Sequence, residues 1–273
     1  MANIRFLFRN LVDTATVTAS PALLAGLPAT NLQTQQRNRS ARTTSTASQD
    51  FSFSWPTAQT IDMIAMRRFN LTAAAQMACP TYSDSAFTTS IAANAAANCF
   101  GYTGLDANDI LTESDFILLK NFARFPTLSS VVQSLKVTVT DAANPDGYFD
   151  ISRMFIGKLK ELFYQVSYSG ALLTMDDAST QRRMDDGSLV SDKRFKFRKL
   201  EINQNYCAPS DWASILSALR FVGKDKDVFI SVFPTAGDYT EVYYQGAFKF
   251  TGMSAFDRNN PNAAGMRMIF EET

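Results

Sequence analysis

The stretch KRFKFRKLEINQNYCAPSDWASILSALRFVGKDKDVFISVF, residues Lys193–Phe233, decides the fold because it holds a strand, a helix and a second strand. Its first part has the two-residue period of a β-strand with one solvent-exposed face. Phe195 and Phe197 alternate there with Arg194, Lys196 and Arg198. After Arg198 the apolar parity shifts by one residue to Leu200 and Ile202, which predicts a bulge or a second buried surface. We therefore expect the two phenylalanines to face one layer and the two aliphatic residues another.

A helix is expected over residues 209–222. Pro209 occupies the favoured first helical position, and Gly223 closes the helix as a C′ glycine. One apolar stripe suits packing on a sheet: Trp212, Ile215, Leu216, Leu219 and Val222. We expect Trp212 to anchor the helix to that sheet, and a strand to follow through Val228, Ile230 and Val232.

Composition narrows the classes of function. The chain has 273 residues and zero formal net charge, so it carries no overall charge that would attract nucleic acid or an anionic membrane. It contains no histidine, which removes Ser-His-Asp and Cys-His catalysis, histidine metal sites and the usual proton shuttle. We expect no enzyme activity and no cofactor.

Three cysteines, Cys79, Cys99 and Cys207, lie far apart and form no zinc-ligand pattern. Their odd number suggests a reduced compartment, although Cys79 and Cys99 flank one loop and could pair. No segment has the ~20 apolar residues of a membrane span, and the first residues lack the apolar run of a signal peptide. We expect a soluble protein made in the cytoplasm, with no metal and no membrane insertion.

Short strands separated by turn residues fill the first region, residues 1–157. They are expected at residues 4–8, 50–55, 61–69, 116–122, 135–140 and 148–156. In the second of these, Phe51, Phe53 and Trp55 share one face, and Pro56 is expected to end the strand. The third is apolar on both parities up to Arg67 and Arg68, as a central strand would be. An Ala-rich insertion at 73–105 is expected to be a surface loop or an extension to another subunit, unable to build a core.

The second region, residues 158–273, holds strands at 162–174, 241–250 and 266–270 beside the stretch quoted above. A polar hairpin at 175–192 turns at Asp186-Gly187. The whole chain is therefore predicted to be all-β: an antiparallel β-sandwich followed by a β-sandwich or barrel with one flanking helix.

Several segments resemble structural proteins from the tails of bacteriophages. These segments are LPATNL (27–32), FSFSW (51–55), IDMIAMRRFNLTAAA (61–75) and DAANPDGYFDISRMFIGK (141–158). The first region is similar to the galactose-binding-like (discoidin-like, jelly-roll) module of those proteins, and the second to their tail-tube or distal-tail domain. The resemblance covers most of the chain but includes no catalytic motif, and the Ala-rich insertion departs from it.

The resemblance implies a distal-tail or baseplate component located in the virion tail tip and assembled in the host cytoplasm. Its implied partners are further copies of itself in a ring, with a hexamer expected, the tail tube protein, and other tail-tip or fibre proteins. In such a ring the strand after Lys193 would be where subunit core passes into subunit interface. The competing function is a carbohydrate-binding module that contacts the host surface.

Nine charged residues are candidates for the subunit interface: Asp176, Asp177, Arg182, Arg183, Asp185, Asp186, Arg194, Lys196 and Arg198. The four acids could also be a metal or glycosidase cluster, but exposed charge runs usually serve solvated or intersubunit faces. The cations between Phe195 and Phe197 suggest a nucleic-acid surface, a tube lumen or, most simply, the wet face of a strand.

Three aromatic residues, Trp55, Tyr82 and Tyr102, are the candidates for stacking on a glycan. The alternative for Trp55 is core or rim packing, because it ends a strand just before Pro56. Arg67 and Arg68 are expected to be a rim pair.

Overall fold

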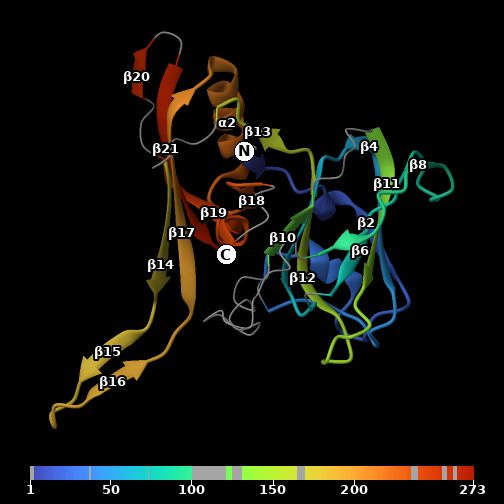
Figure 1. Cartoon of the computed structure of the whole chain (residues 1–273), viewed down its shortest axis with the longest axis horizontal. Coiled ribbons are helices and arrows are strands. Elements are labelled where there is room, and N and C mark those ends of the chain that lie inside the picture. The colour runs from blue at the N-terminus through green and yellow to red at the C-terminus, as the bar shows by residue number, and fades with distance from the viewer. Residues whose placement is uncertain are drawn as a thin grey trace. The chain divides into compact units, whose positions relative to one another are not determined.

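The computed structural model describes residues 3–36, 38–72, 74–99, 121–124, 131–164, 170–234, 239–253, 257–260 and 263–273. By its internal contacts the chain forms two compact units. Unit 1 comprises Met1–Glu161 and Val228–Gly246, and unit 2 comprises Leu162–Asp227 and Ala247–Thr273. Both units consist mainly of antiparallel strands (Figure 1), so the predicted all-β class is confirmed.

Unit 1 contains most of the strands. They are β1 (Arg5–Leu7), β2 (Thr16–Ser20), β3 (Ala41–Arg42), β4 (Gln49–Thr60), β5 (Met63–Phe69), β6 (Gln76–Ala78), β7 (Thr81–Tyr82), β8 (Ser90–Ala92), β9 (Ala97–Asn98), β10 (Asn121–Arg124), β11 (Val131–Thr140), β12 (Asp150–Gly157) and β13 (Lys160–Glu161). It also holds the 3₁₀ helices η1 (Leu11–Thr14) and η2 (Ala29–Gln33) and the short helix α3 (Tyr239–Tyr243).

Unit 2 contains the helix α2 (Pro209–Val222) and the strands β14 (Ala171–Asp177), β15 (Thr180–Arg183), β16 (Leu189–Asp192), β17 (Lys196–Cys207), β20 (Asp257–Asn260) and β21 (Ala263–Glu272). Strands β18 (Asp227–Ser231) and β19 (Gln245–Met253) begin in one unit and end in the other. Among the described residues, no helix has the length and hydropathy needed to cross a membrane.

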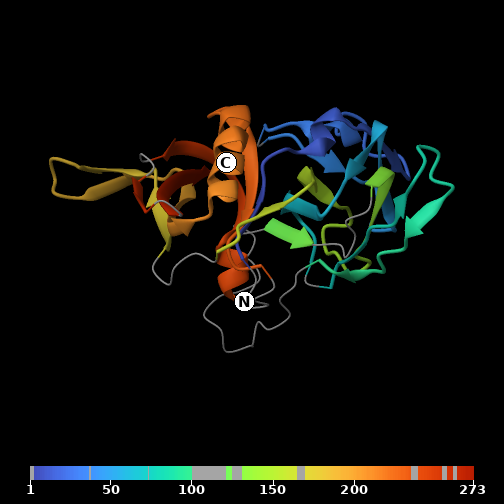
Figure 2. The ribbon, with the colours of Figure 1, turned by 90° about the horizontal axis from the view of Figure 1, so that it is seen from above.

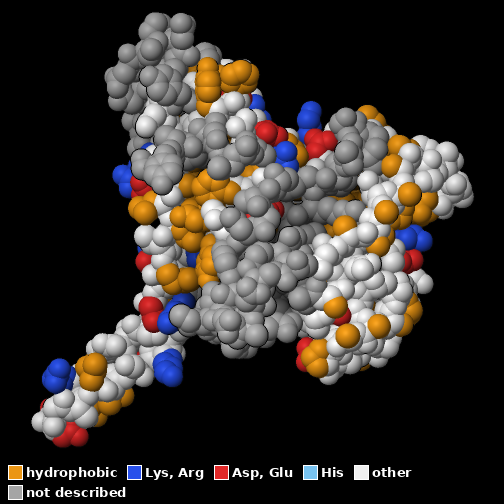
Figure 3. All heavy atoms as spheres, viewed as in Figure 1, with side chains coloured by type: hydrophobic (Ala, Val, Ile, Leu, Met, Phe, Trp, Pro, Cys, Tyr) orange, Lys and Arg blue, Asp and Glu red, His pale blue; other side chains and the backbone are white. Residues whose placement is uncertain are grey.

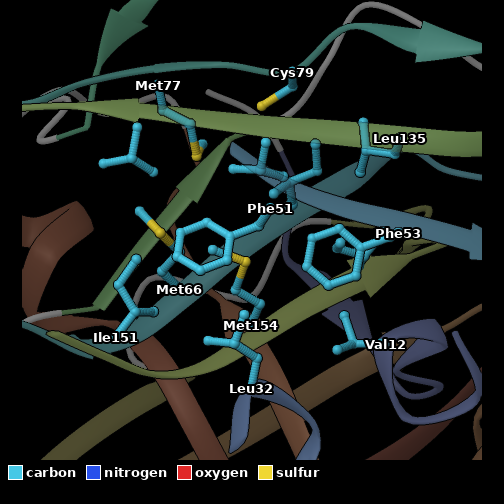
Figure 4. Close-up of a cluster of buried hydrophobic side chains, with 14 of the residues drawn as sticks. Val12, Leu32, Phe51, Phe53, Met66, Met77, Cys79, Leu135, Ile151 and Met154 are labelled. Carbon is cyan, nitrogen blue, oxygen red and sulfur yellow. The ribbon is translucent and has the colours of Figure 1, made fainter. Parts of the chain in front are cut away.

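Two sheets face each other in unit 1. One has the order β2-β4-β11-β6-β9, and the other has the order β10-β5-β12-β3. Phe51 and Phe53 from the first sheet and Met66, Ile151 and Met154 from the second share one core (Figure 4). Alternation of inward aromatic residues along β4 therefore makes a sandwich, as predicted.

Strand β4 does not end at Pro56 as expected. It continues to Thr60, and its register against β11 shifts between Val132 and Ser134. Pro56 lies in the part of β4 that this irregularity leaves out of the ladder, where its missing N–H costs no hydrogen bond.

Strand β5 is paired on both sides, by β10 and β12, which confirms the predicted central strand. The predicted rim pair is wrong for Arg67, which is only 4 % exposed, whereas Arg68 is exposed and has a positive φ of 48°. The central position of β5 places Arg67 in the interior.

The Ala-rich insertion contributes to the core, contrary to expectation. Its described part, residues 74–99, forms β6 to β9 and buries Ala75, Met77, Cys79 and Cys99 completely. Small side chains fit there because β6 and β7 pair directly with β11. Cys79, Cys99 and Cys207 are buried and form no disulfide within the described residues, so the pairing of Cys79 with Cys99 does not occur in this structure.

In unit 2 the sheet order is β19-β21-β17-β14, and α2 lies beside β21. The helix begins and ends where predicted, with Gly223 at φ 61° and with Ile215, Leu219 and Val222 buried. Trp212 is half-buried. The strand expected from residue 241 begins only at Gln245, because α3 occupies the preceding residues.

Three further predicted strands are confirmed at the chain's start, middle and end, as β1, β18 and β21. The strand predicted at 116–122 lies almost wholly outside the described residues. So do residues 165–169 of the strand predicted at 162–174.

Candidate functional site

A two-stranded hairpin extends from the sheet of unit 2. We call residues 171–197 the arm; it consists of β14, β15, β16 and the start of β17 (Figure 2). Every residue of β15 and β16 is exposed, and among the described strands these two pair only with each other. The predicted Asp186-Gly187 turn is present: Gly187 has a φ of 83° and donates its N–H to the Met184 carbonyl at 2.9 Å.

Large apolar side chains are exposed along the arm, beside charged ones (Figure 3). They are Leu172 (52 % exposed), Met175 (57 %), Met184 (45 %), Leu189 (55 %), Val190 (50 %) and Phe195 (60 %). An isolated two-stranded hairpin is marginally stable in water, and exposed apolar clusters usually mark interaction surfaces. The arm therefore exposes apolar surface of the kind that interaction surfaces contain.

Three of the four candidate acids of the arm form contacts within unit 2. Asp176 forms an ion pair with Lys199 at 2.5 Å, and Asp177 forms one with Lys196 at 3.8 Å. Asp186 accepts hydrogen bonds from the N–H and hydroxyl of Ser188, which lower the pKa of the Asp186 carboxyl. No group of three or more acids or cysteines that could hold a metal occurs in the described parts of the chain. The geometry thus favours turn capping over a metal or glycosidase site.

The arginines of the hairpin differ in their contacts. Arg183 donates to the Gly187 carbonyl at 3.0 Å, and Arg194 pairs with Asp192 at 3.2 Å. Arg182 and Asp185 are exposed and form no ion pair or side-chain hydrogen bond within the described residues. These two charges are the ones left available to a partner.

Arg198 is wrong as an interface candidate. Its side chain is fully buried, and its guanidinium forms a bidentate ion pair with the Glu272 carboxylate. Arg198 Nε lies 3.0 Å from Glu272 Oε2, and Arg198 Nη2 lies 2.7 Å from Glu272 Oε1. It also lies 5.5 Å from the centre of the Phe248 ring. A cation can occupy this inward position because a carboxylate faces it there.

Phe195 and Phe197 lie on the opposite face of the strand from Leu200 and Ile202, as expected, but the bulge expected after Arg198 is wrong and Phe195 is exposed rather than buried. Strand β17 pairs with β14 without a break from Lys196 to Ile202. The buried parity is constant through Arg198, Leu200 and Ile202, while Phe195 lies on the exposed side. The alternation was real, but its inward face carries the arginine rather than the phenylalanines.

The outward face of this sheet balances its charges. Lys199 lies between Asp176 and Glu271, and Arg267 pairs with Glu201 at 2.6 Å. Acids on neighbouring strands therefore match the cations, which does not favour the nucleic-acid interpretation.

Trp55 is wrong as a glycan contact, because it is 2 % exposed and donates its indole N–H to the Leu11 carbonyl at 2.9 Å. Its alternative, core packing, is what the structure shows. Tyr82 is half-buried and forms an edge-to-face pair with Phe87 at 5.5 Å. Tyr102 lies outside the described residues.

The loop between Tyr82 and β8 is ordered by one carboxylate. Asp84 accepts hydrogen bonds from the backbone N–H groups of Ala86, Thr88 and Thr89. The bonds from Thr88 and Thr89 lower the pKa of Asp84 to about 2. Asp84 is thus ionised at neutral pH. Its hydrogen bonds hold the loop that carries Phe87 beside Tyr82.

No protein-family model and no curated protein matches this chain. Solved structures with some likeness include the chitosan-binding module 1 of a chitosanase/glucanase from Paenibacillus sp. IK-5, at 15 % identity and a TM-score of 0.37. Two others are the modules CpGH89CBM32-6 and CBM32-1 from Clostridium perfringens, at 12 % and 10 % identity and TM-scores of 0.37 and 0.38. Each match covers 55 % of this chain and 99 % of the other. Likeness of this degree carries no argument about function.

Proposed function

We propose that this protein is a non-catalytic structural protein whose copies join through the arm of unit 2. The observation that carries this proposal is the row of large apolar side chains exposed on the arm, whose outer strands β15 and β16 pair, among the described residues, only with each other. Burial of such side chains contributes roughly 1.5–3 kcal/mol each, so a partner that covers several of them would bind the arm firmly.

The setting we propose is a ring in the tail tip of a bacteriophage, where each arm lies on the next copy. Support for this setting comes from the sequence resemblance, which implies a distal-tail or baseplate component with tail-tube and fibre partners. A closed ring would also pair or cover the free edge of β14, which among the described residues pairs only with β17.

Removing the outer part of the arm, residues 178–195, should abolish self-association and leave the subunit folded. Asp177 and Lys196 are directly opposite each other in the ladder, so residues 178–195 can be replaced by Asn-Gly, a two-residue hairpin turn. We expect the wild type to form multimers in light scattering and negative-stain images, and the shortened protein to remain monomeric with unchanged circular dichroism.

Point variants test whether assembly depends on the apolar side chains of the arm rather than on the length of the hairpin. Leu189→Ser combined with Val190→Ser should weaken assembly, whereas Gln181→Ser, an exposed polar change on the same hairpin, should not. A wild-type protein that stays monomeric at high concentration, or a shortened protein that assembles normally, would contradict the proposal.

The second candidate function is carbohydrate binding by unit 1. It is favoured by the half-buried Tyr82–Phe87 pair, because partly exposed aromatic faces on an ordered loop can stack on sugar rings. We expect glycan-array binding that is lost in the Tyr82→Ala, Phe87→Ala double variant while the fold is kept. An array without signal for the wild type would remove this candidate.

A further inference from the structure

Unit 1 contains a pocket that neither the arm nor the aromatic pair explains. It has a volume of about 270 Å³ and is lined by Arg9, Leu11, Gln59, Thr60 and Lys158. Sites for drug-sized ligands typically measure about 300–1,000 Å³, so this pocket suits a group of about one sugar ring.

The two cations meet here because of a close backbone approach. A Cβ atom on Gly157 would lie 2.7 Å from the Arg9 carbonyl oxygen, so only glycine lets the chain after β1 pass this close to the end of β12. Lys158 follows directly, and the Asp62 N–H donates to the Gly157 carbonyl at 3.0 Å. The ends of β4 and β12 and the segment after β1 thus converge on one concavity.

The charges of this pocket are not balanced locally. Arg9 and Lys158 are exposed and form no ion pair or side-chain hydrogen bond within the described residues. Asp62 is the acid that Lys158 influences, but burial raises the pKa of Asp62, and its Oδ1 is buried without a hydrogen-bond partner. Lys158 still attracts the Asp62 carboxylate electrostatically, but neither cation is in an ion pair among the described residues, so a ligand carboxylate or phosphate could contact both Arg9 and Lys158.

The remaining lining is suited to a hydroxylated ring. Gln59 donates its Nε2 to the carbonyl and hydroxyl oxygens of Thr57, so it offers its Oε1 as an acceptor for a sugar hydroxyl. Thr60 supplies a hydroxyl, and Leu11 supplies an apolar surface for ring C–H groups. We propose that this pocket binds an acidic monosaccharide unit, with Arg9 and Lys158 on its anionic group and Gln59 and Thr60 on its hydroxyls. This site is separate from the arm and is independent of the proposed assembly.

Calorimetric titration of the whole protein at low salt tests this proposal. The probes are glucuronic acid, glucose 6-phosphate, neutral glucose and inorganic phosphate. We expect one or both acidic sugars to bind, glucose to bind much more weakly, and affinity to fall with added salt because exposed charges are screened. The two acidic probes distinguish a carboxylate ligand from a phosphate ligand.

Variants connect the binding to the pocket. Arg9→Gln and Lys158→Gln should each lower affinity by about three- to tenfold, in keeping with partly exposed charge-assisted contacts. Arg39→Gln, an exposed arginine of the same unit with no side-chain contact within the described residues, should leave affinity unchanged. Gly157→Ala should weaken binding by displacing the Arg9 segment.

Three outcomes would overturn the proposal. They are equal binding of glucose and glucuronic acid, inorganic phosphate binding as tightly as the sugar phosphate, and full affinity in the Arg9→Gln, Lys158→Gln double variant. None of these outcomes affects the assembly proposal, which is tested by the arm variants.

Discussion

Replacing Glu272 with glutamine is expected to destabilise unit 2 by about 3 kcal/mol, because it removes the carboxylate that faces the buried guanidinium of Arg198. Arg198 is fully buried, and Glu272 accepts from its Nε, its Nη2 and its backbone N–H. An amide in place of the carboxylate can accept fewer of these bonds and carries no charge. The cost is thus that of taking a carboxylate away from a buried cation rather than that of one lost contact.

Urea unfolding can measure this effect in unit 2 specifically. The chain has two tryptophans, Trp55 in unit 1 and Trp212 in unit 2, so a Trp55→Phe background leaves one reporter in unit 2. The matched control is Glu271→Gln, which makes the same chemical change one residue earlier, on the outward face beside Lys199. There the expected loss is about 0–1 kcal/mol, as for exposed ion pairs.

A double replacement distinguishes pairing from packing. Arg198→Met combined with Glu272→Leu removes both charges, and such replacements of buried pairs are often neutral or stabilising. We expect the double variant to recover most of the stability that Glu272→Gln loses. If the Glu272→Gln protein unfolds at the same urea concentration as the Glu271→Gln protein, the Arg198–Glu272 pair does not contribute the expected stability to unit 2.

Arg198 also shows where sequence patterns mislead. Alternation along Phe51, Phe53 and Trp55 predicted the correct buried face, because all three inward residues are apolar. The same rule failed on β17, because hydrophobicity assigns Phe195 inward and cannot recognise a buried cation whose partner is far away in sequence. The sequence signal for the partner of Arg198 lay in the last strand, β21, where Glu272 continues the alternation of Met268 and Phe270 on one face.

The helix was predictable for a different reason. Pro209 and Gly223 act locally, through fixed backbone geometry at the two ends, so no distant partner is needed.

The core role of the Ala-rich insertion was not predictable in this way. Small residues become core only when a neighbour such as β11 leaves a narrow space, and that depends on pairing between distant segments. The candidate pocket was missed similarly, because Arg9 and Lys158 are 149 positions apart (158 − 9) and meet through Gly157.

Asn10 illustrates such a distant role and yields the second large prediction. Its side chain acts as a piece of strand beside β12: Nδ2 donates to the Met154 carbonyl at 2.8 Å, and Oδ1 accepts from the Ile156 N–H at 3.0 Å. The same Oδ1 accepts from the Val12 N–H at 3.2 Å and so caps η1. One buried amide thereby satisfies three backbone groups and fixes the segment that carries Arg9 and Leu11.

Asn10→Ala should therefore lower the stability of unit 1 by about 2–4 kcal/mol, since buried backbone donors and acceptors lose their partners. Asn10→Asp tests the mechanism, because it keeps the acceptor for Ile156 and Val12 but places an oxygen against the Met154 carbonyl. It should also destabilise the unit, and more at neutral pH than at a pH where the new carboxyl is protonated and can donate. Asn38→Ala, at an exposed asparagine, is the control. Urea unfolding followed through Trp55 in a Trp212→Phe background measures all three variants, and an Asn10→Ala protein as stable as the Asn38→Ala protein would show that Asn10 does not tie η1 to β12.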